Sequence, residues 1–374
     1  MKIGIITMHK VLNYGSALQA FATQQVLTSL GYDSEIIDYE YKKPKEKEII
    51  SIKRRIIQAI VYVRDLLRGF PQERKRQNFN LFYTHYFTLT KDYYTATSIV
   101  ANPPLFDVYM SGSDQVWNPR FAGNDVNFML AFAPEDKPKI AFASSFATDV
   151  IDDAHKELYS PQLSRYNAIS VREQSGIEII KTLTGKDAVL CCDPTLLLNQ
   201  EVVSKLSIQS SLKLKYRFLL VYGLHYMFDP YPYLYNIINY VSEQMKCRVV
   251  YLDGRNADLF KRNAKVVSSA GPCEFLWLFE HAEFVITTSF HGTAFSLIYD
   301  KPFYSVVDKD SKTDSRISSL CKLVNAEHSL IDYRENPNVN DLELRQLKGD
   351  NLALDTLRDD ALAYLKKNLS KFEK

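Results

Sequence analysis

The chain opens with an alternation of apolar runs and helical periodicity that predicts a parallel β-sheet. Residues 2–7 form a short apolar run typical of a buried strand, and a polar, glycine-containing turn follows at 13–16. Residues 17–30 then carry apolar side chains at helical spacing up to Gly31, and residues 34–38 form a second apolar run. A strand, a turn, a helix and a strand within about 38 residues predict a βαβ unit, whose strands lie parallel.

The same alternation returns along most of the chain, which places the protein in the α/β class. Further elements of a first unit are predicted as strands at 106–110, 139–146 and 167–171 and a helix at 173–182. A second unit is predicted with strands at 216–222, 248–252, 284–288 and 303–307 and helices at 233–245, 274–282 and 292–299. We therefore expect two doubly wound, Rossmann-like domains that face a cleft, with ligands at the carboxyl ends of the strands.

The expected domains are an N-terminal α/β domain over residues 1–200 and a C-terminal α/β domain over residues 212–340. The polar stretch at 194–211 suits a linker between them. Residues 341–374 form a tail, in which one or two amphipathic helices at 341–372 are expected to pack back over either domain.

Composition narrows the functional classes. The 374 residues are 46% hydrophobic and 24% charged, as in soluble globular proteins, and 46 Lys and Arg against 44 Asp and Glu give a net charge of +2. This balance argues against nucleic acid as a partner. Five cysteines without framework spacing argue against a secreted disulfide scaffold, and no apolar stretch is long enough to cross a membrane. We expect a cytoplasmic protein.

Residues 42–76 differ from the rest of the chain in charge. Twelve Lys or Arg and four acidic residues give this basic segment a local net charge of +8. Between residues 49 and 68, isoleucine, valine and leucine side chains supply an apolar face beside arginines. One hypothesis is therefore an interfacial helix that meets anionic lipid or a phosphate-bearing substrate, with peripheral membrane contact through residues 49–68. The other is an ordinary helix with a solvated basic face.

The most informative turn joins a predicted strand to a predicted helix. Its residues are Ser289, Phe290, His291, Gly292 and Thr293. Free backbone N–H groups and the positive end of the dipole make a helix N-terminus a site for phosphate or carboxylate. Gly292 permits close backbone approach, the two hydroxyls add donors, and His291 can bind phosphate or act as general acid. The alternative is a capping histidine with a structural hydrogen bond.

Three more turns place polar groups at the carboxyl ends of predicted strands. Asn13, Tyr14 and Gly15 can present backbone amides, although such residues also build plain turns. Residues 111–118 offer Asp114 and Gln115, a set suited to sugar hydroxyls, unless they only tie their own loop together.

At residues 170–173, Arg172 is well placed for a bidentate oxyanion contact or for a simple pair with Glu173. Asp193 and Pro194 read as a turn at the domain boundary. Zinc spacing, a P-loop, a nucleophile elbow and a calcium loop are absent from the sequence, so we expect no metal and no bound cofactor.

At these residues the chain resembles the polysaccharide pyruvyltransferase family. The resemblance rests on residues 13–15 with 18–19, residues 112–118, residues 170–173, residues 193–194, and residues 289–292 followed by 295–296. Together with the predicted strands at either end, these pieces span residues 3 to 307 in family order. The resemblance implies a fold like the GT-B glycosyltransferases, with the acceptor on the N-terminal domain and the donor phosphate on the C-terminal domain.

The resemblance also implies an activity. Phosphoenolpyruvate would be the donor and co-substrate, and its pyruvyl group would be transferred as a cyclic ketal onto two hydroxyls of one sugar in bacterial surface polysaccharide biosynthesis, as in capsule or exopolysaccharide. The acceptor would be a lipid-linked glycan at the inner face of the cytoplasmic membrane, where the basic segment would hold the enzyme.

Carried across by the resemblance, the site residues take the following roles. His291 and Asp114 would be catalytic, as acid or phosphate contact and as base. The donor would be bound by Arg172, Ser289, Phe290, His291, Gly292, Thr293 and Arg316. The acceptor would be bound by Asn13, Tyr14, Gly15, Asp114 and Gln115.

One departure from the family concerns Ser289. Family members can carry an arginine at that place, two residues before the histidine, and a serine cannot supply its charge. We expect Arg316, which follows the strand at 303–307, to substitute for it. Two alternatives stay open at this point: a GT-B glycosyltransferase that uses a nucleotide sugar, with Asp253 on the ribose, and a non-catalytic glycan-binding relative.

Overall fold

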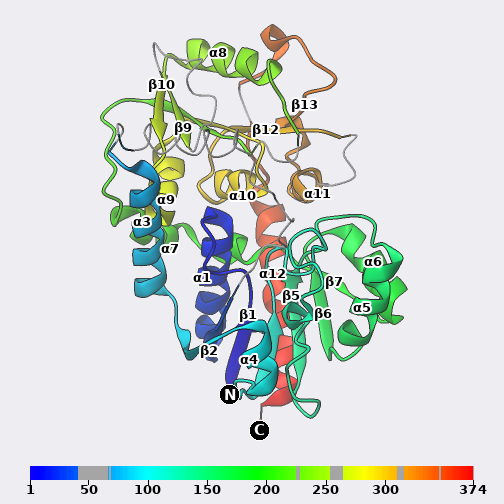
Figure 1. The fold of residues 1–374 in the computed structure, drawn as a ribbon. Helices are drawn as coiled ribbons and strands as arrows, with labels where there is room; N and C mark the ends of the chain where they lie inside the picture. Colours follow the sequence, from blue (N-terminus) through cyan, green and yellow to red (C-terminus); the bar gives the residue numbers. More distant parts are fainter. Residues whose placement is uncertain are drawn as a thin grey trace, which may run out of the picture.

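The computed structural model describes residues 1–40, 66, 69–224, 228–252, 264–309, 316–344 and 347–373. Two parallel sheets with alternating helices form two units stacked one above the other, as Figure 1 shows. The predicted α/β class is therefore confirmed. Most of the basic segment, residues 42–65 and 67–68, lies outside the described residues, and so does Asp253.

The first unit is built on a seven-stranded sheet in the order β3-β2-β1-β4-β5-β6-β7 among the described residues. Its strands are β1 (Lys2–Ile6), β2 (Asp33–Tyr39), β3 (Leu89–Tyr94), β4 (Val108–Ser111), β5 (Lys139–Ser144), β6 (Ala168–Val171) and β7 (Val189–Leu190). The helical elements are α1 (Tyr14–Ser29), α3 (Pro71–Tyr86), α4 (Ala96–Ala101), η1 (Val126–Met129), α5 (Asp153–Leu163) and α6 (Gln174–Thr184). Because every pairing is parallel, the carboxyl ends of these strands share one edge.

The second unit is built on a six-stranded parallel sheet in the order β10-β9-β8-β11-β12-β13 among the described residues. Its strands are β8 (Phe218–Tyr222), β9 (Arg248–Leu252), β10 (Ala264–Val267), β11 (Phe284–Thr287), β12 (Phe303–Val307) and β13 (Leu330–Asp332). The helical elements are η2 (Pro194–Leu197), α7 (Gln200–Ile208), α8 (Tyr233–Met245), α9 (Pro272–His281), α10 (Phe290–Ile298), α11 (Arg316–Leu323), η4 (Glu327–Ser329) and η5 (Val339–Asp341). The C-terminal tail follows as α12 (Asn351–Leu369) and η6 (Ser370–Phe372).

The stretch at 194–211, which the sequence suggests as a linker, holds the two helical elements η2 and α7. Val203 and Leu206 on α7 are buried, and Ser204 on the same helix donates a hydrogen bond to Glu280 of α9 at 2.5 Å. The polar composition of this stretch belongs to the solvent face of a helix that packs on the second unit. The predicted domain limits at residues 200, 212 and 340 stay a prediction.

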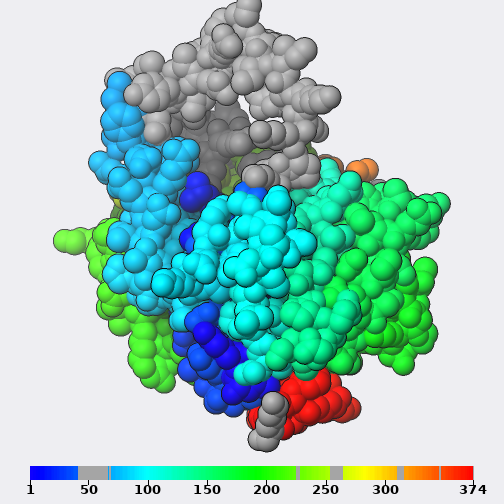
Figure 2. Space-filling model, turned by 60° about the horizontal axis from the view of Figure 1, so that its bottom comes forward, coloured from blue at the N-terminus to red at the C-terminus, as the bar shows by residue number. Residues whose placement is uncertain are grey.

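The C-terminal tail packs against the first unit, which is one of the two domains over which the sequence predicts that it packs. Helix α12 begins beside α11 and runs down along the first sheet, where its red end lies near the N-terminal residues (Figures 1 and 2). The Tyr364 hydroxyl donates to the Ala141 carbonyl of β5 at 2.8 Å, and the Arg358 Nε donates to the Leu196 carbonyl at 2.6 Å. One helix therefore ties the two units together from the C-terminal side.

The two units also share a buried core at their junction. The Tyr14 ring at the start of α1 stacks on Phe275 of α9, with ring centroids 4.8 Å apart, and its hydroxyl donates to the Ala270 carbonyl at 3.2 Å. Lys75 of α3 is buried too, and its Nζ lies 4.5 Å from the centroid of the Tyr14 ring. This lysine, counted in the basic segment, thus packs between the units instead of facing solvent.

Candidate functional site

Five polar side chains from both units converge where the units meet. They are Ser16, Asp114, Arg172, Asp193 and His291, and we call them the junction cluster. The first four follow or flank strands of the first sheet, and His291 follows β11 of the second sheet. Parallel topology thus brings residues distant in sequence to facing sheet edges, which is where α/β proteins bind ligands.

Asp193 lies at the centre of the junction cluster, at the N-cap of η2. Its Oδ1 accepts hydrogen bonds from the Thr195 backbone N–H at 2.9 Å and from the Thr195 hydroxyl at 2.7 Å. Its Oδ2 accepts a hydrogen bond from Arg172 Nη1 and lies 3.6 Å from His291 Nε2. Burial opposes ionisation, but the Arg172 guanidinium and His291 outweigh it and hold the pKa of Asp193 well below its usual range. Asp193 is therefore a carboxylate.

Arg172 follows β6 and is buried, with 1% of its side chain exposed. Its Nη1 is bound to Asp193, while its Nη2 lies 3.7 Å from Asp114 Oδ1, beyond hydrogen-bond length. Among the described residues, Nε and Nη2 have no hydrogen-bond partner. Buried donors without partners are rare and costly in folded proteins. Because these two donors form one edge of the guanidinium, they fit a bidentate carboxylate or phosphate.

His291 lies in the first turn of α10 with its ring against the first unit. Within the described part of the chain, its Nε2 is buried and lacks a hydrogen-bond partner. A methyl group on Gly15 would overlap the imidazole, so the N-terminus of α1 can touch this ring only through glycine. Likewise, a methyl group on Gly292 would overlap the side chain of Thr287. The first N–H groups of α10 have no acceptor within the helix and point their positive dipole end at this place.

Asp114 lies in the loop after β4 with a left-handed backbone, φ 73°. Its Oδ2 accepts a hydrogen bond from the Ser16 hydroxyl in the first turn of α1. The neighbouring Gln115 accepts a hydrogen bond from the Asn118 side-chain amide at 2.7 Å, so its oxygen serves the loop itself. Asp114 is the member of this loop that reaches the junction cluster.

The backbone strain at Asp114 is accompanied by positive φ angles in β5, the neighbouring strand, and in the turn that follows it. Ala143 and Ala147 have φ of 47° and 49°, a region that costs a residue with a Cβ about 1–3 kcal/mol. The pairing register of β5 shifts between Ala141 and Ser144. Glu173 holds the turn that follows, because its Oε1 accepts from the Phe146 and Ala147 N–H groups at 2.7 and 3.1 Å. Such strain clusters at functional sites.

The other predicted donor residues surround α10. The Ser289 N–H donates to Thr287 Oγ1 at 3.0 Å, and the Thr293 hydroxyl is fully buried, donating to the Ser289 carbonyl at 3.2 Å. Thr293 therefore serves the helix as it stands. The Phe290 ring lies 4.8 Å from the Arg172 guanidinium carbon and 5.9 Å from that of Arg316. The structure thus brings Arg316, at the start of α11, to the edge of the junction cluster.

The predicted acceptor residues at the start of α1 divide into two kinds. Asn13 is the N-cap of α1, where its side chain accepts from the Ser16 N–H at 3.1 Å, and Gly15 contacts His291. Tyr14 is 1% exposed and packs between the units. Its backbone, more than its ring, is positioned near the junction cluster.

Sequence reasoning assigned no site role to Asp193, Ser16 or Glu173. The sequence predicts a turn at Asp193, and this residue does cap η2, but its second oxygen contacts Arg172 of the first unit and His291 of the second. The signal available in the sequence was the position of Asp193 directly after a strand. Without knowledge of its partners, that position fits a plain turn as well as a functional site. Its partners are 21 and 98 residues away in sequence, too far for local pattern to connect them.

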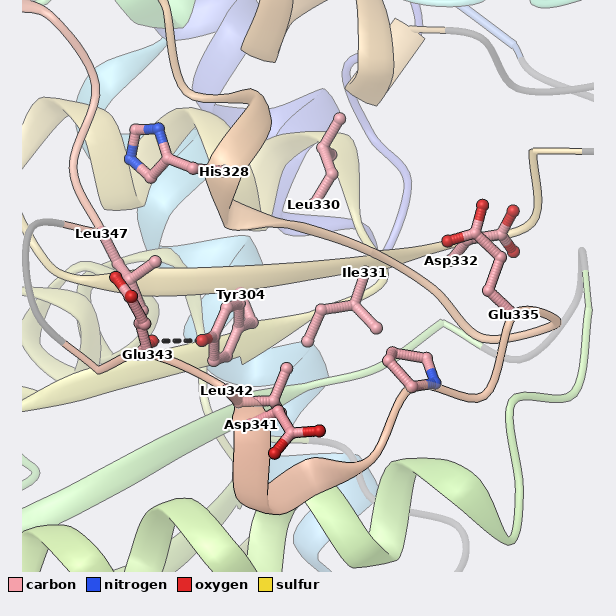
Figure 3. A pocket seen from close by; sticks show the side chains of 11 residues that line it. Tyr304, His328, Leu330, Ile331, Asp332, Glu335, Asp341, Leu342, Glu343 and Leu347 are labelled. Atoms are coloured by element: carbon pink, nitrogen blue, oxygen red, sulfur yellow. Dashed lines mark hydrogen bonds between the residues drawn. The ribbon is translucent and has the colours of Figure 1, made fainter.

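A separate cavity of about 460 Å³ lies beside β13, and its lining does not include the residues of the junction cluster (Figure 3). Carboxylates from Asp332, Glu335 and Asp341 line it, and the Tyr304 hydroxyl donates to the Glu343 carbonyl across it. This lining repels anions and does not suit the predicted donor. The described residues hold no group of three side chains arranged for a metal ion and no helix long and apolar enough to span a membrane.

Comparisons with known proteins identify a family and a fold for this chain. A model of the family described as polysaccharide pyruvyl transferase matches residues 13–310. A search of curated proteins finds no match. Among solved structures, UDP-GlcNAc 2-epimerase from Methanocaldococcus jannaschii has a TM-score of 0.54 at 10% identity, covering 99% of this chain and 100% of that one. The MnaA–UDP structure from S. aureus has a TM-score of 0.55 at 10% identity, covering 99% and 97%.

A plant structure shares the same architecture. Arabidopsis thaliana UGT89C1 has a TM-score of 0.52 at 10% identity, covering 99% of each chain. At these identities the similarity shows the fold, and the fold is that of the GT-B epimerases and glycosyltransferases.

Proposed function

Because the chain belongs to the polysaccharide pyruvyl transferase family and is therefore a transferase of polysaccharide biosynthesis, we propose that its donor is phosphoenolpyruvate. It transfers the pyruvyl group as a cyclic ketal onto two hydroxyls of one sugar. The observation that carries the proposal is the pair of buried Arg172 donors, Nε and Nη2, which have no hydrogen-bond partner among the described residues and lie next to the first turn of α10 with its free N–H groups. A small dianion or trianion satisfies all of them.

Donor binding follows from these groups. The bidentate edge of Arg172 takes one anionic group of phosphoenolpyruvate, and the N–H groups of α10 with His291 take the other. Arg316 adds a second positive charge beside Phe290, where Ser289 supplies none. The cluster excludes most water, since Arg172 and His291 side chains are 1% and 11% exposed, and electrostatic contacts are stronger in such a site.

The reaction needs one acid and one base. A proton goes to C3 of the enol, which makes C2 an oxocarbenium-like electrophile, and a sugar hydroxyl attacks C2. A second hydroxyl then displaces the phosphate from C2 and closes the ketal, so two hydroxyl protons leave as one proton is gained at C3 and one at phosphate or solvent. His291 supplies the proton or holds the phosphate, and Asp114 accepts a hydroxyl proton.

The acceptor side is formed by the first unit. The Asp114 side chain accepts a hydrogen bond from the Ser16 hydroxyl, and Gln115, Asn13, Tyr14 and Gly15 surround the same strand edge. We propose a lipid-linked glycan as acceptor, at the inner face of the cytoplasmic membrane, with surface polysaccharide such as capsule as the product. The charge of residues 42–76 and the apolar side chains of residues 49–68 support peripheral contact with that membrane.

The experiment that tests this function supplies phosphoenolpyruvate with a panel of lipid-linked and free glycans. Phosphate release that depends on the glycan, together with an acid-labile pyruvate ketal on it by mass spectrometry, is the expected result. Transfer of sugar from UDP-sugars under the same conditions, with no phosphate release from phosphoenolpyruvate, would contradict the proposal. His291→Ala is the matched control and should release no phosphate.

A further inference from the structure

Asp193 connects the two units within the junction cluster, and we infer that it is a positioning residue that sets Arg172 and His291 relative to one another. The effect of Asp193 on donor binding rests on the proposed function, because Arg172 and His291 form the proposed donor site. Its geometry stands independently. Asp193 itself does not touch the donor in this assignment and acts through the two residues that do.

The two oxygens of Asp193 have different partners. Oδ1 is taken by the N–H and hydroxyl of Thr195, two residues along the same turn, which fixes the plane of the carboxylate. Oδ2 is then directed at Arg172 from the first unit and His291 from the second. A carboxylate that only capped η2 would need Oδ1 alone.

A second carboxylate competes for the same guanidinium. Asp114 Oδ1 lies 3.7 Å from Arg172 Nη2, while Asp193 holds Nη1 at hydrogen-bond length. With Asp193 in place, Arg172 keeps its Nε and Nη2 edge open and Asp114 stays outside hydrogen-bond reach. Without the charge of Asp193, we expect the Arg172 guanidinium to turn to Asp114. That ion pair would occupy the Nε and Nη2 donors that bind phosphoenolpyruvate, and it would also occupy the carboxyl of the proposed base.

The position of Asp193 in the chain explains how one residue reaches both units. It follows β7, the last strand of the first sheet, and opens η2, which leads into the second unit. Helix η2 packs on α1, and α10 packs on η2. The crossing of the chain between units therefore supplies the carboxylate that relates the arginine of one unit to the histidine of the other.

The first test needs no donor. In the ligand-free protein, the imidazole nitrogens of His291 are observed by long-range 1H–15N correlation and assigned by their loss in His291→Ala. We expect a proton on Nε2 in the wild type, because this nitrogen faces a carboxylate oxygen. Asp193→Asn should shift the His291 signals, whereas Asp187→Asn, which removes an exposed carboxylate paired with Lys181, should leave them unchanged. Unchanged His291 signals in folded Asp193→Asn would overturn the inference.

The second test measures phosphoenolpyruvate binding by calorimetry in the same proteins. Asp193→Asn should weaken binding by at least about tenfold, and Asp187→Asn by less than about twofold. Thr195→Val removes a donor to Oδ1 and keeps the charge, so it should move both readouts in the same direction by less. If Asp193→Asn does not fold, Thr195→Val serves as the test variant in its place. A wild type that binds no phosphoenolpyruvate contradicts the proposed function, whereas wild-type affinity in folded Asp193→Asn contradicts the role of Asp193.

Discussion

Gly15 lies against the imidazole of His291, so that the first turn of α1 in one unit touches the first turn of α10 in the other. A methyl group at Gly15 would overlap ring atoms of His291. Because α1 follows β1 and α10 follows β11, this contact fixes the distance between the two sheet edges at the junction cluster. The position of the histidine thus depends on a glycine nearly 280 residues before it.

Gly15→Ala tests this contact, since helix propensity and packing predict opposite signs. Alanine in place of glycine in a helix normally stabilises by about 1 kcal/mol. Here the overlap should instead destabilise by about 1–3 kcal/mol and weaken phosphoenolpyruvate binding by about tenfold or more. Denaturant unfolding and calorimetry measure both. In the double variant with His291→Ala, the stability loss should disappear, and an equal loss in both backgrounds would show that the contact is not responsible.

Arg172→Lys separates the charge of this residue from its bidentate edge. Lysine can still neutralise Asp193, so we expect a small change in melting temperature. Loss of the second donor should weaken phosphoenolpyruvate binding about tenfold to a hundredfold, because a hydrogen bond to a charged group contributes about 1.5–3 kcal/mol. Arg217→Lys, in an exposed pair with Glu283, is the matched control. Equal affinity in Arg172→Lys and the wild type would exclude a bidentate contact.

Asp114→Asn should affect the chemical step and spare donor binding. Asparagine keeps the shape and the contact with Ser16 but cannot accept a proton from a sugar hydroxyl. We expect kcat to fall by about a hundredfold or more while the affinity for phosphoenolpyruvate changes by less than about threefold. Single-turnover kinetics with a competent glycan gives the rate. An unchanged kcat would remove Asp114 from the role of base.

The low pKa of Asp193 predicts a stability change in acid. Its folded-state pKa is depressed by Arg172 and His291, so its contribution is fully present above the unfolded-state pKa of about 3.9 and is lost as the pH falls below it. The difference in unfolding free energy between the wild type and Asp193→Asn should therefore shrink as the pH is lowered from about 5 to about 3. Denaturant unfolding at several pH values measures it, and a constant difference would mean that Asp193 does not titrate with unfolding.

Hydrophobic pattern predicted the central strands well and the edge strands poorly. Strands β1, β9 and β12 lie within one residue of the predicted runs because they are buried on both faces. The edge strands β3, β7, β10 and β13 were not predicted, since β3 has three exposed residues in succession and the other three have only two to four residues each. Helix α7 lies in the predicted linker because more of its residues are polar than buried.

The sequence identifies those residues of the candidate site that directly follow predicted strands. Arg172 and Asp114 lie together because parallel topology brings the carboxyl ends of one sheet to one edge, and His291 meets them from the carboxyl end of β11 in the second sheet. The link between them could not be predicted, since the bonding of Asp193 depends on how the two units meet. Likewise, nothing in the local sequence around Gly15 indicates that a histidine of the second unit lies over it.

The most direct test of the account is the thermal stability of the wild type and His291→Ala with phosphoenolpyruvate, using inorganic phosphate and a panel of nucleotide sugars as controls. A ligand that binds the native state raises the melting temperature by mass action. We expect a rise with phosphoenolpyruvate that exceeds the rise with phosphate and is lost in His291→Ala. A rise with a nucleotide sugar and none with phosphoenolpyruvate would contradict it.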